Sequence, residues 1–89
     1  MGQESKLEKD LRRYAEEKGV VFLKLHGRGW PDRLLIGRDG RLAFAELKAG
    51  NGRPGPLQER RVNALRGRGF RATFVHNHQD GEAVIDSLI

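Results

Sequence analysis

Two short apolar segments on either side of a turn constrain the fold of this chain most. Residues 33–38 (Arg-Leu-Leu-Ile-Gly-Arg) and 41–48 (Arg-Leu-Ala-Phe-Ala-Glu-Leu-Lys) flank Asp39-Gly40, a dipeptide typical of a two-residue β-hairpin turn. The pattern predicts a pair of antiparallel strands. Asp32 starts the first strand and Glu46 lies near the end of the second, so the hairpin brings both carboxylates to the same end of the sheet.

The residue types at this end of the hairpin suit metal-dependent phosphodiester hydrolysis. The carboxylates of Asp32 and Glu46 are hard oxygen ligands of the kind that Mg²⁺ or Mn²⁺ prefers. Lys48 is two residues beyond Glu46 and shares its face of the strand, where an ammonium can orient the attacking water. The competing interpretation is a salt bridge between Glu46 and Lys48, with Asp32 only ending a turn. An acid inside an apolar strand is costly unless something compensates its charge.

The remaining sequence alternates between helical and strand patterns and contains no repeat. We expect a helix over residues 5–18, a strand over 20–25, the hairpin, a helix from Pro56 to about Gly67 or Gly69, a strand over 70–75, and a short helix or turn over 81–89. The order αβββαβ, with a small C-terminal addition, predicts an α/β fold. Its small mixed sheet should carry the first helix on one face and the second on the other.

Composition bounds the class of protein and its partners. The 89 residues are enough for one small domain, expected to span 1–89, and the net charge is +5. The stretch from Arg53 to Arg71 contains arginine at six positions and a single acid, Glu59, which favours a nucleic-acid partner. No cysteine is present, which excludes disulfides and thiolate zinc sites and fits a cytoplasmic protein. We expect no membrane segment, and the absence of a P-loop argues against a nucleotide cofactor.

Three segments together resemble the virus-type replication-repair nuclease (VRR-NUC) domain of the PD-(D/E)xK superfamily. They are Gly29-Trp30-Pro31-Asp32-Arg33, Phe44-Ala45-Glu46-Leu47-Lys48-Ala49 and Leu57-Gln58. The chain looks most like the stand-alone type found in phages and bacteria, which would place it in the cytoplasm of a bacterial host. The resemblance implies a restriction-endonuclease-like core and a DNA endonuclease dependent on Mg²⁺ or Mn²⁺. Its products would carry 5′-phosphate and 3′-hydroxyl ends.

The resemblance and the residue pattern together give a full set of expected site residues. The catalytic set is Glu8, Asp32, Glu46, Lys48 and Gln58. The metal is expected on Asp32, Glu46 and the carbonyl of Leu47, and DNA is expected on Lys24, Arg28, Arg53, Arg60 and Arg61. The tripeptide His76-Asn77-His78 follows a strand near the C-terminus and is interpreted as a solvated turn.

Two roles are open for the carboxylate of the first helix. Ser5 and Glu8 have capping-box spacing, so Glu8 could instead close the helix start. The related archaeal-type junction resolvases have a glutamate about three turns before the closing glycine, and Glu8 matches that place relative to Gly19. Glu4, one turn earlier, is the alternative.

The substrate and assembly are further expectations. A homodimer would present two sites to branched DNA, such as a four-way (Holliday) junction, which one small domain cannot span. The main alternative is a non-catalytic nucleic-acid-binding module in which the acids form salt bridges, and a structural subunit that kept the nuclease fold is another.

Overall fold

The computed structural model describes residues 3–50 and 52–89, with side chains from residue 5 onward. Its elements are α1 (Gln3–Glu17), β1 (Val21–Lys24), β2 (Arg33–Ile36), β3 (Leu42–Leu47), α2 (Pro56–Gly67), β4 (Arg71–Val75) and α3 (His78–Asp86). The predicted α/β fold and the order of its elements are confirmed. In the part of the chain described, no helix has the length and apolar character needed to cross a membrane.

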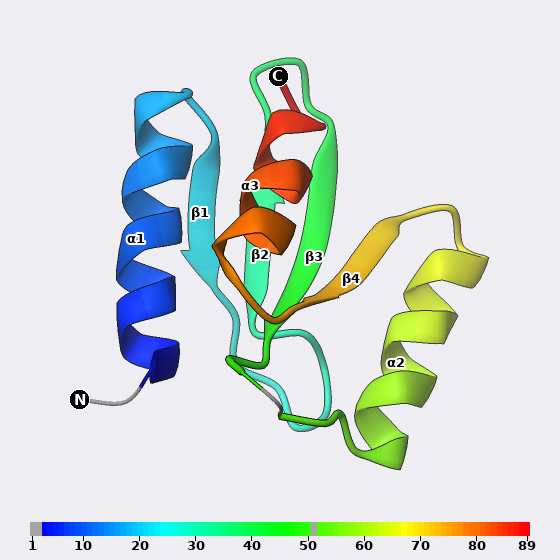
Figure 1. Cartoon of the computed structure of the whole chain (residues 1–89). Helices are drawn as coiled ribbons and strands as arrows, with labels where there is room; N and C mark the ends of the chain where they lie inside the picture. The colour runs from blue at the N-terminus through cyan, green and yellow to red at the C-terminus, as the bar shows by residue number, and fades with distance from the viewer. Residues whose placement is uncertain (1–2, 51) are drawn as a thin grey trace.

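The four strands form one mixed sheet in the order β1-β2-β3-β4 (Figure 1). β1 pairs with β2 and β2 with β3 in antiparallel ladders, as the hairpin pattern predicts. β4 returns parallel to β3 after α2, with Leu47 opposite Val75 at the end of the ladder. The chain therefore leaves β3, crosses through α2 and comes back beside it, so the residues after β3 are fixed by the end of β4.

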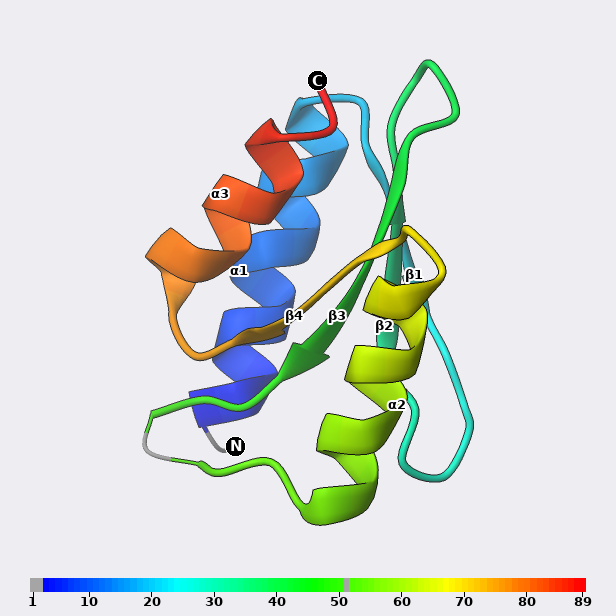
Figure 2. The same ribbon diagram turned by 90° about the vertical axis from the view of Figure 1, so that its right-hand side faces the viewer.

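Two helices cover one face of this sheet and the third covers part of the other. Figure 2 shows α1 and α3 together on one side, with α2 across the sheet. Between the first pair and the sheet lies an apolar core of buried side chains: Leu7, Leu11, Ala15, Val20, Phe22, Leu35, Ala43, Ala45, Leu47, Val75, Val84, Ile85 and Leu88. The regular alternation along β3 places Ala43, Ala45 and Leu47 in this core and turns Phe44 and Glu46 toward the α2 side.

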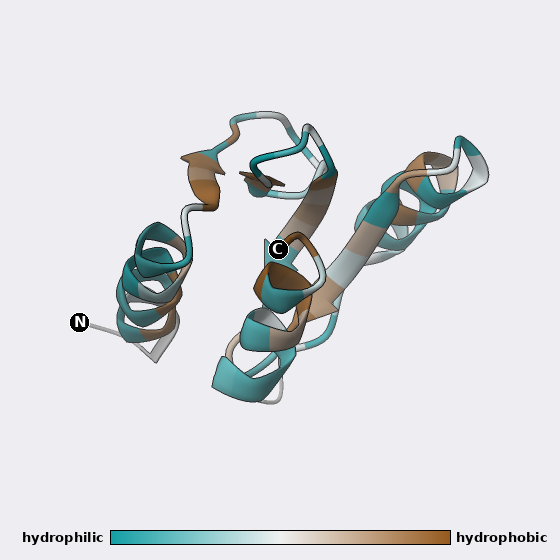
Figure 3. Cartoon of the chain, turned by 90° about the horizontal axis from the view of Figure 1, so that it is seen from above, coloured by the Kyte–Doolittle hydropathy of each residue, from teal (hydrophilic) through white to brown (hydrophobic). Residues whose placement is uncertain are grey.

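The α2 side of the sheet is covered unevenly. Val62 of α2 and Ala72 of β4 are buried there, and the rings of Phe44 and Phe70 meet edge to face with centroids 5.6 Å apart. Toward β1 the cover ends, and Val21 and Leu23 are 48% and 44% exposed. Figure 3 shows the apolar β1 at the far end of the sheet from α2.

The hairpin turn differs from the sequence prediction. Its loop has three residues, Arg38-Asp39-Gly40, because Gly37 and Arg41 form the closing pair through a 2.7 Å hydrogen bond from the Gly37 amide to the Arg41 carbonyl. Gly40 has a φ of +87°, the left-handed conformation that ends a three-residue hairpin loop. The Asp39-Gly40 signal was correctly placed, but the predicted two-residue length was wrong.

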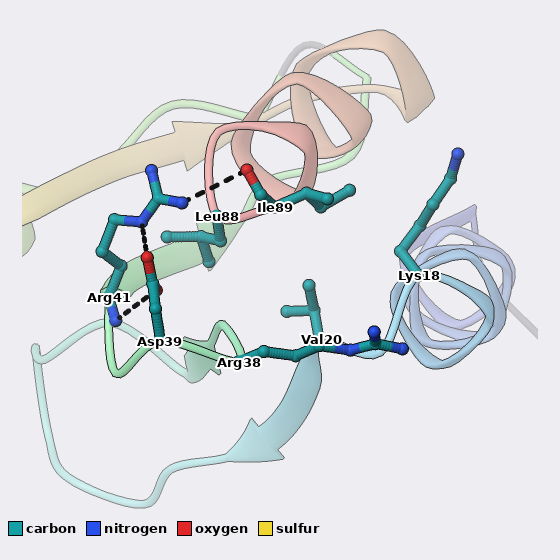
Figure 4. A pocket seen from close by; sticks show the side chains of 7 residues that line it. All are labelled: Lys18, Val20, Arg38, Asp39, Arg41, Leu88 and Ile89. Atoms are coloured by element: carbon teal, nitrogen blue, oxygen red, sulfur yellow. Dashed lines mark hydrogen bonds and ion pairs between the residues drawn. The ribbon is translucent and has the colours of Figure 1, made fainter.

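The C-terminal helix also differs from its prediction, since it begins at His78 rather than at Gly81. Asn77 caps it by accepting a 2.8 Å hydrogen bond from the amide of Asp80. His78 is therefore the first residue of α3 and Asn77 its cap, rather than parts of a free turn. At the other end, Arg41 donates to the Ile89 carbonyl at 3.2 Å and to Asp39 at 2.7 Å, beside a small pocket of about 150 Å³ (Figure 4).

The hairpin packs so closely on the end of α3 that one position excludes a side chain. A Cβ added to Gly37 would collide with the backbone carbonyl of Leu88, just beyond the end of α3, so the backbone of one of the two segments would have to shift. We predict that Gly37→Ala lowers the free energy of unfolding by about 1–3 kcal/mol, the usual range for overpacking. Thermal unfolding followed by circular dichroism measures it.

Gly67→Ala is the matched control, because a Cβ at this last residue of α2 would meet nothing within 4 Å. It should leave the stability unchanged or raise it by up to about 1 kcal/mol. Equal melting temperatures for the Gly37→Ala and Gly67→Ala proteins would contradict the close packing of the hairpin on α3.

Candidate active site

The register of β2 on β3 places Asp32 opposite Glu46. In this antiparallel ladder Ile36 pairs with Leu42, Leu34 with Phe44 and Arg33 with Ala45. Moving one residue beyond the last pair in each strand brings residue 32 opposite residue 46. The three-residue loop decides this alignment. A two-residue Asp39-Gly40 turn would have placed Asp32 opposite Leu47 and so out of register with Glu46.

Glu46 is a buried carboxylate on the α2 side of the sheet, with the residue 6% exposed. Its Oε2 accepts a 3.2 Å hydrogen bond from Nε2 of Gln58. The Nζ of Lys48 lies 3.8 Å from the same oxygen. A carboxylate can stay ionised at such burial when a cation and a hydrogen-bond donor compensate it. The structure thus brings together three of the residues expected in the site.

Gln58 connects the start of α2 to this carboxylate. Its Oε1 accepts a 3.0 Å hydrogen bond from the amide of Gly55, the residue that caps α2, while its amide group donates to Glu46. Pro56 follows the cap at the first helical position, where a missing N–H costs nothing. The side chain of Gln58 is therefore held at both ends, and its orientation toward Glu46 is fixed by the helix start.

Asp32 is held at the end of the ladder by β3 and by its own neighbour. Its Oδ1 accepts a 3.2 Å hydrogen bond from the amide of Leu47, the residue next to Glu46. Its Oδ2 lies 3.2 Å from the guanidinium of Arg33, and the side chain is 26% exposed. The Leu47 side chain is buried in the core at 1% exposure, so an expected metal ligand from this residue would be its backbone carbonyl.

The backbone of Lys48 is fixed by the end of β4. The Lys48 amide donates to the Val75 carbonyl at 2.8 Å, and Nδ1 of His76 lies 2.9 Å from the Lys48 carbonyl. Sequence reasoning dismissed His76 as part of a solvated turn. Its position directly after β4 was the feature that could have indicated its role. Because β4 runs parallel to β3 with Val75 beside Leu47, His76 comes next to Lys48.

The guanidinium of Arg33 lies between Glu8 and Asp32 and pairs with both. α1 already contains Ser5, so the alternative capping box is absent, and Glu8 pairs with Arg12 at 3.0 Å and Arg33 at 3.5 Å. The hydrogen bond from Arg12 lowers the pKa of Glu8, partial burial opposes this, and the charges of Arg12, Arg33 and Lys24 lower it further. The alternative, Glu4, has a side chain outside the described part of the structure.

Arg33 is the residue at the site that sequence reasoning overlooked. It is 5% exposed and joins Glu8 of α1 to Asp32 at the end of β2. The strand pattern could have indicated this position. Arg33 and Leu35 are two residues apart in β2, so their side chains point to the same face of the sheet, the one that α1 covers. An open cleft of about 340 Å³ beside it is lined by Ser5, Glu8, Lys24 and Arg33.

The expected DNA-binding cations are distributed around this end of the molecule. Lys24, Arg28, Arg53 and Arg60 are exposed, while Arg61 is half-buried. The guanidinium of Arg61 stacks over the ring of Trp30 at 4.3 Å from its centroid. Lys24 ends β1, and the loops that carry Arg28 and Arg53 both lie at the end of the sheet where β3 finishes (Figures 1 and 2).

The donor set fits a hard divalent cation held by few protein ligands. Asp32 and Glu46 offer carboxylates, and Leu47, which follows Glu46 in β3, is joined to Asp32 through its backbone amide. Among the residues that the structure describes, no group of three or more histidine, cysteine, aspartate and glutamate side chains is gathered for a metal. Mg²⁺ is commonly bound through one or two carboxylates with water completing its shell, so two are sufficient.

Comparison with solved structures gives this arrangement a family. The sequence matches no protein-family model and no curated protein. A solved structure described as a VRR_NUC domain superposes with a TM-score of 0.87 at 27% identity, covering 100% of both chains. A second, described as a VRR_NUC domain protein, has a TM-score of 0.76 at 17% identity, covers 100% of this chain and 89% of its own, and supports the fold alone. On this likeness over the full length of both chains, the chain is a VRR-NUC domain, a domain of a nuclease family.

Proposed function

We propose that this domain is a divalent-metal-dependent DNA endonuclease. The observation that carries the proposal is the buried carboxylate of Glu46, which lies opposite Asp32 and is contacted by Lys48 and Gln58. Two carboxylates, an ammonium and an amide at the end of one hairpin are the groups that hydrolysis of a phosphodiester requires.

In this mechanism Asp32 and Glu46 would hold one Mg²⁺ or Mn²⁺, and the Leu47 carbonyl would be a third ligand. A bound divalent cation would polarise the phosphoryl oxygen and lower the pKa of a coordinated water. Lys48 orients the attacking water and stabilises charge that develops on the phosphate. Gln58 keeps the Glu46 carboxylate in one orientation through its 3.2 Å hydrogen bond. Cleavage leaves a 5′-phosphate and a 3′-hydroxyl.

Glu46→Gln tests the chemistry with little change in shape. It removes the charge that holds the cation, so metal-dependent nicking of supercoiled plasmid should fall by roughly 100-fold or more. Glu59→Gln, an exposed acid in the first turn of α2, is the matched control and should cut as the unmodified protein does. Circular dichroism confirms folding. A folded Glu46→Gln protein that nicks at the normal rate would remove Glu46 from the active site.

A non-catalytic nucleic-acid-binding module remains the second candidate, and one observation favours it. Each described carboxylate of the site has a cationic neighbour, Lys48 for Glu46 and Arg33 for Asp32. Such pairs can be structural. Plasmid incubated with the domain and Mn²⁺ separates the two functions, because a binding module shifts DNA mobility without producing nicked circles.

We propose that DNA lies along the exposed cations of α2 and the preceding loop. Replacing Arg53 and Arg60 by glutamine removes two phosphate contacts, so the slope of log K against log salt should become shallower by about 2. Lys9→Gln with Arg13→Gln makes the same change of charge on exposed positions of α1, across the sheet. Fluorescence anisotropy with labelled duplex, metal removed by EDTA, measures both. Equal slopes for the two double variants would refute this binding surface.

We further propose that the active form is a homodimer that cuts branched DNA such as four-way junctions. The uncovered apolar strip of Val21 and Leu23 on β1 supports an interface there, since water-exposed apolar surface favours association. Leu23→Asp should then produce a monomer in sedimentation velocity, and preference for junctions over linear duplex should be lost.

Ile89→Asp is the control for this substitution, because Ile89 is an exposed apolar residue, at 61%, by the hairpin tip. It should leave the dimer intact. A normal protein that sediments as a monomer and cuts linear duplex as readily as junctions would exclude the dimer.

A further inference from the structure

Arg33 is a buried cation between two carboxylates of different elements. One guanidinium nitrogen lies 3.5 Å from Glu8 of α1, and another lies 3.2 Å from Asp32 and donates to the Asp32 carbonyl at 2.9 Å. The side chain is 7% exposed, and its Nε has no partner within the described residues. A guanidinium keeps its charge under all ordinary conditions, so this is a permanent positive charge beside the site.

Glu8 is surrounded by cations rather than by other acids. Arg12 donates to both of its carboxylate oxygens, at 3.3 Å and 3.0 Å. Arg12 is itself anchored, since it donates to the Phe22 carbonyl at 2.9 Å and lies over the Phe22 ring at 5.0 Å. Together with Arg33 and the nearby charge of Lys24, three cations act on this one carboxylate.

These contacts oppose binding of a divalent cation at Glu8. Such an ion would have to displace Arg12 from the oxygens it occupies, and it would sit beside fixed positive charges, whose repulsion grows as the site is buried. It would also break the contact of Arg33 with Glu8, leaving a buried guanidinium with one of its two carboxylate partners lost. The geometry leaves Asp32 to share a metal with Glu46 alone.

We propose that Arg33 is a positioning residue that holds Asp32 for a single divalent cation and keeps Glu8 out of its coordination. Glu8 serves to neutralise and orient Arg33. The inference rests on the proposed metal-dependent function and removes Glu8 from the metal-binding groups of that function. The site then takes one ion per chain, at Asp32 and Glu46.

Calorimetric titration of the full chain with Mn²⁺, without DNA, tests this. The unmodified protein should bind one ion. Glu8→Gln should keep that stoichiometry and a Kd within about twofold, whereas Glu46→Gln should weaken binding by roughly 10-fold or more. Glu17→Gln, an exposed acid on the same helix, controls for the loss of one charge. Binding of two ions, or weakening by Glu8→Gln that matches Glu46→Gln, would overturn the proposal.

Arg12→Gln combined with Arg33→Gln gives the complementary measurement. Removing both guanidinium groups that pair with Glu8 frees this carboxylate, so the stoichiometry should rise from one Mn²⁺ to two, a change that loss of packing alone would not produce. A folded double variant that still binds one ion would overturn the exclusion of metal from Glu8 by these cations. If this variant does not fold, the Glu8→Gln titration decides alone.

The outcomes also separate this inference from the proposed function. Weakening by both Glu8→Gln and Glu46→Gln overturns the role of Arg33 and leaves a metal-dependent nuclease. Failure of the unmodified protein to bind Mn²⁺ removes both.

Discussion

The buried carboxylate of Glu46 is the interaction on which the site depends. Burying a carboxyl group to 6% exposure is costly without polar partners, and here the amide of Gln58 and the ammonium of Lys48 contact it. Those two partners belong to different elements. Gln58 lies in the first turn of α2, and Lys48 follows β3, where a hydrogen bond to β4 fixes its backbone. The crossover through α2 and the return of β4 beside β3 thus both serve this one group.

The fold and the central part of the site could be predicted from local patterns. Alternation around Asp39-Gly40 predicted the hairpin, Pro56 predicted the start of α2, and the sequence Glu46-Leu47-Lys48 predicted that Glu46 and Lys48 lie together. The loop length was missed, because Asp-Gly suits both a two-residue turn and the end of a three-residue loop. That difference of one residue decides whether Asp32 or Arg33 lies opposite Glu46, and register is settled by packing of both strands at once.

The contacts that sequence reasoning missed share a physical cause. The pairing of Arg33 with Glu8 and Asp32, and the approach of His76 to Lys48, join elements far apart in the chain, and no local pattern encodes those contacts. A glutamate in a first helical turn looks like a cap until the helix is seen to begin earlier. An arginine after Pro-Asp looks like a surface cation. Its burial becomes clear only when the face of β2 on which it lies is known to be covered by α1.

The arrangement of β3 also links correct folding to the geometry of the candidate site. Leu47 is buried in the core on one side of the strand, and its neighbour Glu46 is buried on the other. A slip of one residue would put a carboxylate among the core side chains and a leucine on the opposite face, so a misaligned molecule loses stability and the geometry of the site together. A molecule in the wrong register therefore cannot persist as a stably folded protein with an altered site.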